Sequence, residues 1–418
     1  MNLLIKNGRV IDPANGIDKL ADILIKNGRI AQIGKNLKGK RRTIEAEGML
    51  ITPGLIDIHT HLREPGREDD ETIGSGARAA IAGGFTTICV MPNTNPCIDD
   101  KTVVRFIYDR ARETNLGNIL PVAAITKERK GEELTEFGEL VKAGAIGFSD
   151  DGNSIRNSRI MRRALEYAKI FTRPIIVHCE DTGLSAGGVI NEGYLSANLG
   201  LPGIPKQAEE IIVGRDLMLA ELTESRIHIA HLSTAGSVEL IRQAKKKGIR
   251  VTCETCPQYF TLTESAAKDF DTKSKVNPPL REEKDLRAIK KGLLDGTIDV
   301  IASDHAPHSA EEKEKDFLAA PFGMIGLETT LPLSLALVDR RFPLSQMIAK
   351  LTINPAKILG IDKGTLGIGE EADITIINTK AEWTLKLENL KSKSKNTPFL
   401  GKKLKGKAIF TIVGGRSV

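Results

Sequence analysis

The middle of the chain alternates short apolar runs with amphipathic stretches. The apolar runs are the length of buried strands and predict eight of them, at 55–59, 85–91, 119–125, 145–148, 174–178, 226–230, 249–253 and 298–303. The stretches between them show helical spacing and predict helices at 72–82, 100–114, 132–143, 158–171, 207–222, 236–247 and 283–294. Eight strands alternating with helices favour a (β/α)₈ barrel, a TIM-type α/β fold, over a doubly wound open sheet. Periodicity alone does not exclude the second.

Both ends of the chain have a different texture, with short strands and glycine turns. Near the N-terminus, Ile5–Ile11 is echoed by Ile25–Ile30, and each copy contains Asn-Gly, which is typical of a β-hairpin. The C-terminal part returns to strand-like segments at 364–377 and 408–413. We therefore expect a small β-sandwich domain from residues 1–52 plus 358–418, beside a barrel of residues 53–357.

Composition narrows the function classes. The chain has 418 residues, a formal charge of +6 and only 4% aromatic residues, so its lysine tracts lack the stacking platforms of a nucleic-acid surface. No apolar run approaches the roughly 20 residues that span a membrane, and no signal-peptide pattern is present. Five scattered cysteines indicate reduced thiols. We expect a cytoplasmic protein that binds neither nucleic acid nor membrane.

Two histidines follow the first barrel strand at the spacing of a metal site. His59 and His61 lie two residues apart, and on a strand such residues point to the same face. Strand alternation places Arg63 on that face as well. A metal pair beside a guanidinium predicts a metallohydrolase whose substrate carries a carboxylate.

Metal-ligand residues also follow four other strands, where the active sites of barrels gather. These are Asp150 and Asp151, His178, His231, and Asp304. All seven histidines of the chain lie in these motifs. His228 is expected to be structural, because alternation turns it away from His231. His305 is expected to support or pack against its neighbour Asp304.

These motifs carry a family resemblance that runs the length of the chain. Pro53–Gly66 and Ala302–His308, the latter followed by Lys313, resemble the two signatures of the cyclic amidohydrolases, and more narrowly of the class I, long bacterial dihydroorotases. Shorter segments also match that family: Met91–Pro96, His178–Asp181, Val276–Arg281 and Asn396–Pro398.

The resemblance implies a zinc-dependent hydrolase that reversibly cyclises N-carbamoyl-L-aspartate to (S)-dihydroorotate, the third step of de novo pyrimidine (UMP) biosynthesis. It implies two Zn²⁺ per subunit, one held by His59, His61 and Asp304 and the other by His178 and His231, with Asp151 and a hydroxide bridging them. Asp304 would act as general base and then acid. The implied substrate contacts are His61, Arg63, Asn93, Asn277, His308, Phe322 and Gly323. Segment 309–321 is expected to be a loop that closes over substrate.

Other interpretations remain at this point. A hydantoinase, dihydropyrimidinase or allantoinase would share the scaffold, but many of these relatives bridge the metals with a carboxylated lysine. No lysine lies between Ile146 and Arg156. A metal-free scaffold protein is expected to lack some of the six ligand positions, and this chain keeps them all. The resemblance also suggests a homodimer and an association with aspartate transcarbamoylase.

Overall fold

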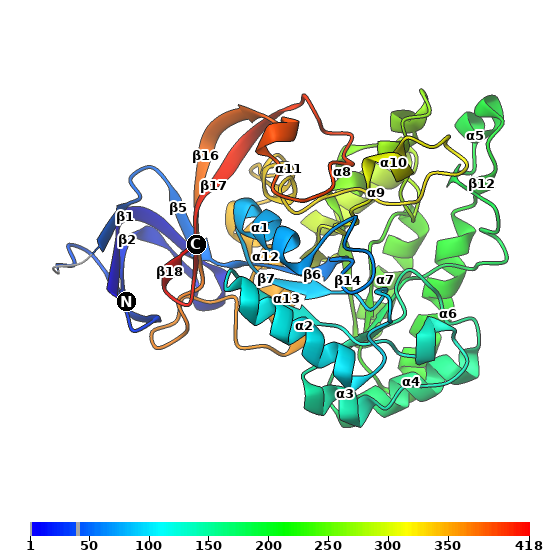
Figure 1. The fold of residues 1–418 in the computed structure, drawn as a ribbon, viewed down its shortest axis with the longest axis horizontal. Coiled ribbons are helices and arrows are strands. Elements are labelled where there is room, and N and C mark those ends of the chain that lie inside the picture. The colour runs from blue at the N-terminus through cyan, green and yellow to red at the C-terminus, as the bar shows by residue number, and fades with distance from the viewer. Residues whose placement is uncertain (1, 39–41) are drawn as a thin grey trace.

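The structure is a computed structural model that describes residues 2–38 and 42–418, and its helices lie around a central group of strands (Figure 1). Eight parallel strands form a closed ring. In ring order the strands are β6 (Leu55–Thr60), β7 (Phe85–Val90), β8 (Asn118–Pro121), β9 (Phe148–Ser149), β10 (Ile175–Val177), β13 (Ile227–Ile229), β14 (Val251–Thr255) and β15 (Val300–Ile301). Each neighbour pairs in parallel, for example Asp57 with Ile88. The predicted barrel is confirmed, and every strand lies within or beside its predicted range.

Two single bridges complete the ring where the regular ladders stop. Ala123 pairs with Phe148 and connects β8 to β9, and Thr60 pairs with His305 just beyond β15, which connects the last strand to the first. The second bridge lies at the strand ends that bear the candidate metal ligands. Closure of the barrel therefore brings the first and eighth motifs side by side.

Helices cover the outside of the ring between successive strands. They are α1 (Ile73–Gly83), α2 (Lys101–Thr114), α3 (Phe137–Ala143), α4 (Ser158–Ile170), α6 (Gln207–Thr223), α7 (Ala235–Lys246) and α9 (Glu283–Leu294), followed after β15 by α12 (Leu344–Leu351) and α13 (Ile353–Leu359). All seven predicted helices are present. The predicted start of α3 at 132 is wrong, because the chain first makes a bridge between Thr126 and Leu134.

Shorter elements lie in the connections. They are β11 (Ile190–Asn191), α5 (Tyr194–Leu199), β12 (Gly203–Ile204), α8 (Pro257–Thr261), α10 (Ala310–Lys313), α11 (Thr330–Leu335) and the 3₁₀ turns η1 (Pro13–Asn15), η2 (Lys127–Arg129), η3 (Glu264–Ala267), η4 (Thr272–Ser274) and η5 (Leu387–Asn389). Several of them follow the carboxyl ends of the strands, so they surround the mouth of the barrel where the candidate ligands lie.

A second sheet combines both ends of the chain. Its strands are β1 (Asn2–Asp12), β2 (Ile17–Lys26), β3 (Arg29–Gly34), β4 (Arg42–Glu45), β5 (Leu50–Pro53), β16 (Ile374–Thr384), β17 (Lys403–Val413) and β18 (Arg416–Ser417). The order is β18-β17-β16-β5-β1-β2-β3, with β4 also on β1, and β16 runs antiparallel to β5. The expected pairing of N- and C-terminal segments is therefore present, while the proposed domain boundaries stay a prediction.

The two Asn-Gly copies near the N-terminus have different structures. Asn27 and Gly28 make the turn between β2 and β3, as predicted. Asn7 and Gly8 instead form a bulge inside β1, where Asn7 has φ 62° and a β-carbon on Gly8 would come 2.4 Å from Ile51. The hairpin prediction is wrong there. The Asn-Gly pair does not reverse the chain but forms a bulge that packs closely against β5.

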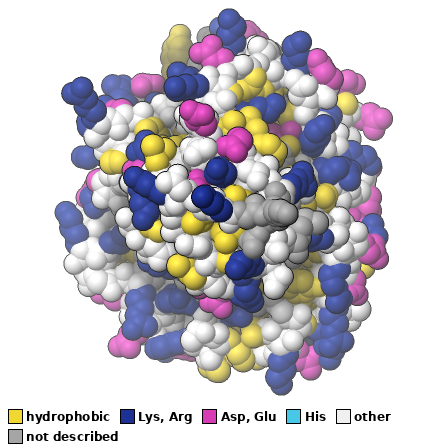
Figure 2. Space-filling model, turned by 90° about the vertical axis from the view of Figure 1, so that its left-hand side faces the viewer, with side chains coloured by type: hydrophobic (Ala, Val, Ile, Leu, Met, Phe, Trp, Pro, Cys, Tyr) yellow, Lys and Arg dark blue, Asp and Glu magenta, His cyan; other side chains and the backbone are white. Residues whose placement is uncertain are grey.

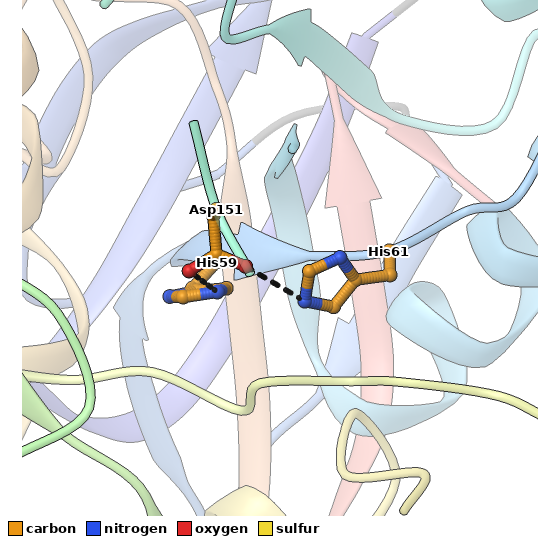
Figure 3. Close-up of side chains that lie close together, drawn as sticks. All are labelled: His59, His61 and Asp151. Atoms are coloured by element: carbon orange, nitrogen blue, oxygen red, sulfur yellow. Dashed lines mark ion pairs between the residues drawn. The ribbon is translucent and has the colours of Figure 1, made fainter. Parts of the chain in front are cut away.

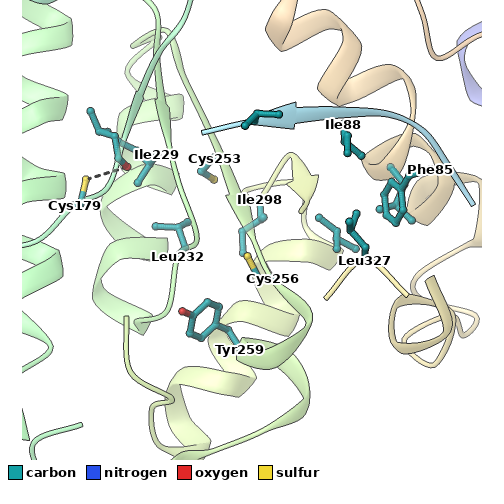
Figure 4. Close-up of a cluster of buried hydrophobic side chains, with 14 of the residues drawn as sticks. Phe85, Ile88, Cys179, Ile229, Leu232, Cys253, Cys256, Tyr259, Ile298 and Leu327 are labelled. Carbon is teal, nitrogen blue, oxygen red and sulfur yellow. Dashed lines mark hydrogen bonds between the residues drawn. The ribbon is translucent and has the colours of Figure 1, made fainter. Parts of the chain in front are cut away.

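The largest core lies between the ring of strands and the surrounding helices. Figure 4 shows a part of it, in which Cys253 and Cys256 lie among Ile229, Leu232 and Ile298. Both thiols are free, and burial raises the pKa of each. They contribute to packing as small apolar side chains.

Charged side chains of both signs are mixed on the one face of the surface that Figure 2 shows. On the face formed by the two-ended sheet, Lys and Arg side chains are scattered among acidic, neutral and apolar ones (Figure 2). Within residues 2–38 and 42–418, none of the helices has the length and apolar character needed to cross a membrane.

Candidate active site

The candidate ligands converge at the carboxyl ends of the barrel strands. His59 lies on β6 and His61 just after it, while Asp151 follows β9, as Figure 3 shows. His178 and His231 follow β10 and β13. Neighbouring strands of a parallel barrel end at the same rim, so residues far apart in sequence meet there.

The carboxylate of Asp151 lies among four imidazoles. Its Oδ1 is 3.4 Å from His59 Nε2, and its Oδ2 is 3.6 Å from His61 Nε2. On the other side, Oδ1 is 3.3 Å from His231 Nε2 and 3.7 Å from His178 Nδ1. All five side chains are buried. The structure thus brings five of the predicted metal ligands together, with Asp151 between two histidine pairs.

The sixth predicted ligand, Asp304, lies beside the first pair. Its Oδ1 is 3.3 Å from His61 Nε2 and 3.7 Å from His59 Nε2. Its side chain is 10% exposed, so it is largely removed from bulk solvent. Asp304 is therefore close enough to the first pair to share a metal ion with it.

Glu254, which the sequence interpretation missed, orients His59 from the side of the ring opposite Asp151. Its Oε1 is 2.5 Å from His59 Nδ1, so the opposite ring nitrogen faces Asp151. Glu254 is fully buried on β14; burial raises its pKa, but His59 and His228 outweigh this and hold the pKa at about 2. A carboxylate behind a ligating imidazole fixes its tautomer and increases its basicity. The sequence feature that could have identified Glu254 is its position as a carboxylate at the end of the seventh barrel strand.

His228 takes part in the same network. Its Nε2 is 3.3 Å from Glu254 Oε2, and its Nδ1 is 2.8 Å from the Thr252 hydroxyl. Alternation was expected to turn His228 away from His231. The strand ends at Ile229 and His231 has φ 31°, so the alternation no longer applies and both rings lie in one buried network.

His61 and His178 are also oriented by hydrogen-bond partners. His61 Nδ1 is 2.8 Å from Asn93 Oδ1, and His178 Nε2 is 2.8 Å from Glu180 Oε2. Glu180 also accepts a hydrogen bond of 2.9 Å from Asn277 Nδ2. Burial raises the pKa of Glu180, but the hydrogen bond and charge of His178, with hydrogen bonds from Ser185 and Asn277, together bring the pKa to about 2. Of the predicted substrate contacts, Asn93 therefore contacts the predicted metal ligand His61 directly, whereas Asn277 is connected to His178 through Glu180.

The donor set fits divalent metal ions. Two groups of possible ligand atoms share Asp151: one has His59 and His61, the other His178 and His231. Among the described residues, His59 Nε2 and Asp151 Oδ1 are buried polar atoms with no hydrogen-bond partner, which is costly unless a cation satisfies them. Imidazole nitrogen with carboxylate oxygen suits Zn²⁺ and neighbouring transition metals. The residues can thus hold two ions with a shared carboxylate.

Arg63 lies beside Pro307 and His308, but strand alternation, on which the prediction was based, does not account for its position. The strand ends at Thr60, and Arg63 has φ 63°, so strand alternation does not place it. Its Nε donates to Pro307 O at 3.0 Å, and its Nη2 is 3.2 Å from His308 Nε2. Arg63 is 9% exposed, and burial lowers its pKa to about 10, so it stays a cation at neutral pH.

A second cluster of possible metal ligands, near His308, is already neutralised by an arginine side chain. Asp70, His308 and Glu312 approach one another closely enough to suggest a metal site. Arg67 Nη2 lies 2.5 Å from Asp70 Oδ2 and 2.9 Å from Glu312 Oε2. Burial and the Arg63 charge lower the pKa of His308 to about 3, which leaves its ring neutral.

The remaining predicted contacts, Phe322 and Gly323, lie beside His308 and Lys275. Phe322 O is 2.8 Å from His308 Nε2, and the Gly323 amide donates to Lys275 O at 2.9 Å. Lys313 donates to the backbone oxygens of Thr272 and Pro321 at 2.8 and 2.7 Å. The segment predicted as a loop at 309–321 contains the short helix α10, and Lys313 ties it to η4.

Three site residues have left-handed backbone conformations. Arg63, His231 and Asp304 have φ values of 63°, 31° and 48°. Such conformations cost of order 1–3 kcal/mol for residues with a side chain and are retained where the surroundings or a function require them. No sequence pattern indicated these conformations.

Comparison with known proteins places this geometry among cyclic amidohydrolases. A family model described as "Dihydro-orotase-like" matches residues 48–237, and one described as "Amidohydrolase family" matches residues 321–418. The chain is similar to dihydroorotases of Geobacter sp. (strain M21) and Endomicrobium trichonymphae, at 52% and 55% identity, over 100% of this chain and 99% of each relative.

A solved L-hydantoinase (dihydropyrimidinase) from Arthrobacter aurescens has a similar fold. Its TM-score is 0.89 at 27% identity, over 100% of this chain and 95% of that one. The fold is therefore shared with hydantoinases, whereas sequence identity is about twice as high with the dihydroorotases.

We predict that Glu254→Gln weakens metal binding. The amide lacks the charge that orients and polarises His59, and loss of such outer partners costs roughly 10- to 100-fold in metal affinity. Competition between apo-protein and a chelating dye measures it directly. Glu47→Gln, at an exposed carboxylate, is the matched control. Equal affinities for the Glu254 variant and the parent would show that His59 does not need this carboxylate.

Proposed function

The chain belongs to the dihydroorotase family of cyclic amidohydrolases, and on this basis we propose that it interconverts N-carbamoyl-L-aspartate and (S)-dihydroorotate. This is the third step of de novo pyrimidine biosynthesis. The supporting observation in the structure is Arg63, a buried guanidinium near the candidate ligands. It makes no direct ion pair within the described residues, and Asp70, Asp304 and Glu312 act on it only from a distance. A buried cation is costly unless paired. The substrate's carboxylate is the partner that this proposal supplies.

The proposed cofactor is a pair of zinc ions. His59, His61 and Asp304 would hold one, His178 and His231 the other, and Asp151 would contact both. When bound, such ions lower the pKa of water and polarise the amide carbonyl under attack. The Glu254, Asn93 and Glu180 side chains keep three of the imidazoles in the required orientation.

Asp304 is the proposed proton carrier. In hydrolysis its carboxylate takes a proton from the attacking water and delivers it to the ring nitrogen that leaves; cyclisation reverses the order. Its Oδ1 position, 3.3 Å from His61 Nε2, puts it at the metal-facing side of the pocket. Its left-handed backbone conformation holds the side chain inward.

The remaining proposed contacts orient the substrate. Arg63 presents its fork to the carboxylate, with Asn93 and His308 beside it. Asn277, together with Phe322 and Gly323, would hold the pyrimidine ring. Arg63, His308 and Gly323 are buried, and Asn93, Asn277 and Phe322 are half-buried, so substrate bound among them would be partly shielded from bulk water. A homodimer and an association with aspartate transcarbamoylase stay predictions from the family resemblance, as does a cytoplasmic location.

The purified protein is expected to hydrolyse dihydroorotate, with activity lost on chelation and restored by zinc. Loss of ring-amide ultraviolet absorbance reports the reaction, and hydantoin, dihydrouracil and allantoin are assayed in parallel. Turnover of one of those rings instead would make the chain a sister enzyme on the same scaffold. No turnover of any ring after zinc is restored would favour the metal-free scaffold.

Asp304→Asn is expected to lower turnover by at least ~10²-fold, because an amide cannot carry the proton. Steady-state kinetics measures the effect, and elemental analysis checks that metal content is retained. The exposed Asp269→Asn serves as control. Turnover close to that of the parent enzyme would remove the role assigned to Asp304.

Arg63→Lys is expected to raise KM for dihydroorotate roughly 10- to 100-fold with a smaller change in kcat, since an ammonium cannot make the bidentate contact. Arg112→Lys, on the exposed face of α2, provides the comparison. An unchanged KM would mean that the carboxylate is held elsewhere.

A further inference from the structure

A segment of the β16–β17 connection reaches the proposed substrate pocket. Residues 385–402 join the two strands, and within them 391–397, here called the strap, cross the mouth of the barrel. Figure 1 shows this hairpin rising from the two-ended sheet and extending along the barrel. The Asn396–Pro398 motif lies at its end, and none of the roles proposed above uses it.

The strap alternates between outward lysines and inward polar side chains. Lys391 and Lys393 are exposed and Lys395 is half-buried, whereas the residues between and after them are buried: Ser392, Ser394, Asn396 and Thr397. An extended segment places every second side chain on one face. Buried faces are usually apolar, so a polar one indicates specific hydrogen-bond partners.

Asn396 connects two separate parts of the pocket wall. Its Oδ1 accepts a hydrogen bond from the His308 amide at 3.2 Å, and its Nδ2 donates to Ala306 O and Gly323 O, both at 3.1 Å. Its own backbone oxygen accepts from the Ile325 amide at 3.0 Å. One side chain therefore holds the 306–308 segment against the segment around Gly323.

The two segments meet closely at this point. Gly323 has φ 139°, and a β-carbon there would lie 2.8 Å from Ala306 O and 3.1 Å from a ring carbon of His308. The backbones can thus approach only because Gly323 has no side chain. The Asn396 amide satisfies the carbonyl oxygens that this approach buries.

Two further strap residues act on the same loop. Ser392 donates to the buried carboxylate of Glu71, which lies 3.3 Å from His305 Nε2. Ser394 donates to Asp70 O at 2.6 Å, and Asp70 Oδ1 accepts from the Ser309 amide at 2.8 Å. The strap therefore contacts or supports the loop from the residue after Asp304 to the residue after His308.

We propose that the strap is a positioning element for the substrate pocket and that Asn396 is its central residue. By fixing 306–308 against 322–323, it holds His308 and the Phe322–Gly323 backbone at the separation that the substrate requires. This inference rests on the proposed function, because the substrate contacts come from it. Asn396 touches neither the substrate nor the candidate ligands in this scheme and acts through the loops.

The test compares Asn396→Ala, Asn396→Asp and the parent enzyme. Alanine removes all three side-chain bonds. It is expected to raise KM for dihydroorotate about tenfold, the equivalent of one to two hydrogen bonds, with a change in kcat below about threefold. Metal content should be unchanged. Amide hydrogen exchange should accelerate in peptides covering 306–308 and 322–325 and stay unchanged in the barrel strands.

The aspartate variant separates the two halves of the contact. It keeps the oxygen that accepts from the His308 amide but lacks both N–H donors, so exchange at His308 should stay slow while exchange near Gly323 and KM both rise. This near-isosteric change also covers the case in which alanine prevents folding. Asn389→Ala, an exposed amide of the same connection, should leave KM and exchange as in the parent.

Three results would overturn the inference: parental exchange in both segments of the alanine variant, faster exchange with an unchanged KM, or a fall in kcat that follows loss of metal. If the parent protein does not turn over dihydroorotate, the proposed function fails on its own. Hydrogen exchange then still decides whether Asn396 holds the two segments together.

Discussion

The buried Asp151 carboxylate is the interaction on which the rest of the site depends. Four imidazoles lie within 3.3–3.7 Å of it, and burying so many polar groups is unfavourable unless their charges are balanced. Burial raises the pKa of Asp151, but the charge of His59 leads the interactions that hold this pKa well below its usual range. A shared anion between two nitrogen pairs therefore suits two cations. The barrel supplies the geometry, because closure brings strand ends from the whole chain to one rim.

Around this centre, precision comes from the loops and their supports rather than from the strands alone. Glu254 and Glu180 orient imidazoles from behind, while Arg63 and Asp304 are turned inward by left-handed backbone conformations. Such conformations persist only when neighbouring structure compensates for them. Hydrogen bonds from the strap to the loop after β15 are part of that compensation, so the two-ended sheet contributes to the pocket through Asn396.

The sequence was informative where a pattern reflects local physics. Alternating apolar runs located all eight barrel strands, and histidine spacing with strand-end position identified the residues that meet around Asp151. It failed where tertiary contacts override local rules. Asn7 has the hairpin signal but lies in a bulge, and the alternation argument for Arg63 and His228 fails because each strand ends earlier than the argument requires. The partners of Glu254 and Asn396 lie 195 and 88 residues away in the chain, so the sequence alone does not show what either side chain contacts.

The comparison with hydantoinases shows why fold alone does not decide the substrate. The L-hydantoinase of Arthrobacter aurescens shares the architecture at a TM-score of 0.89, so the barrel and its strand-end rim are common property. The side chains at that rim can differ between proteins that share the fold. Here the carboxylate between the histidine pairs is an aspartate, and the buried Arg63, which makes no direct ion pair within the described residues, lies beside His308. Asp70, Asp304 and Glu312 favour the charged form of Arg63 without pairing with it directly, so an anionic ligand offsets more of the cost of burying this cation than a neutral ring does. The charge around Arg63, rather than the barrel fold, is therefore the feature that favours a ligand with a carboxylate.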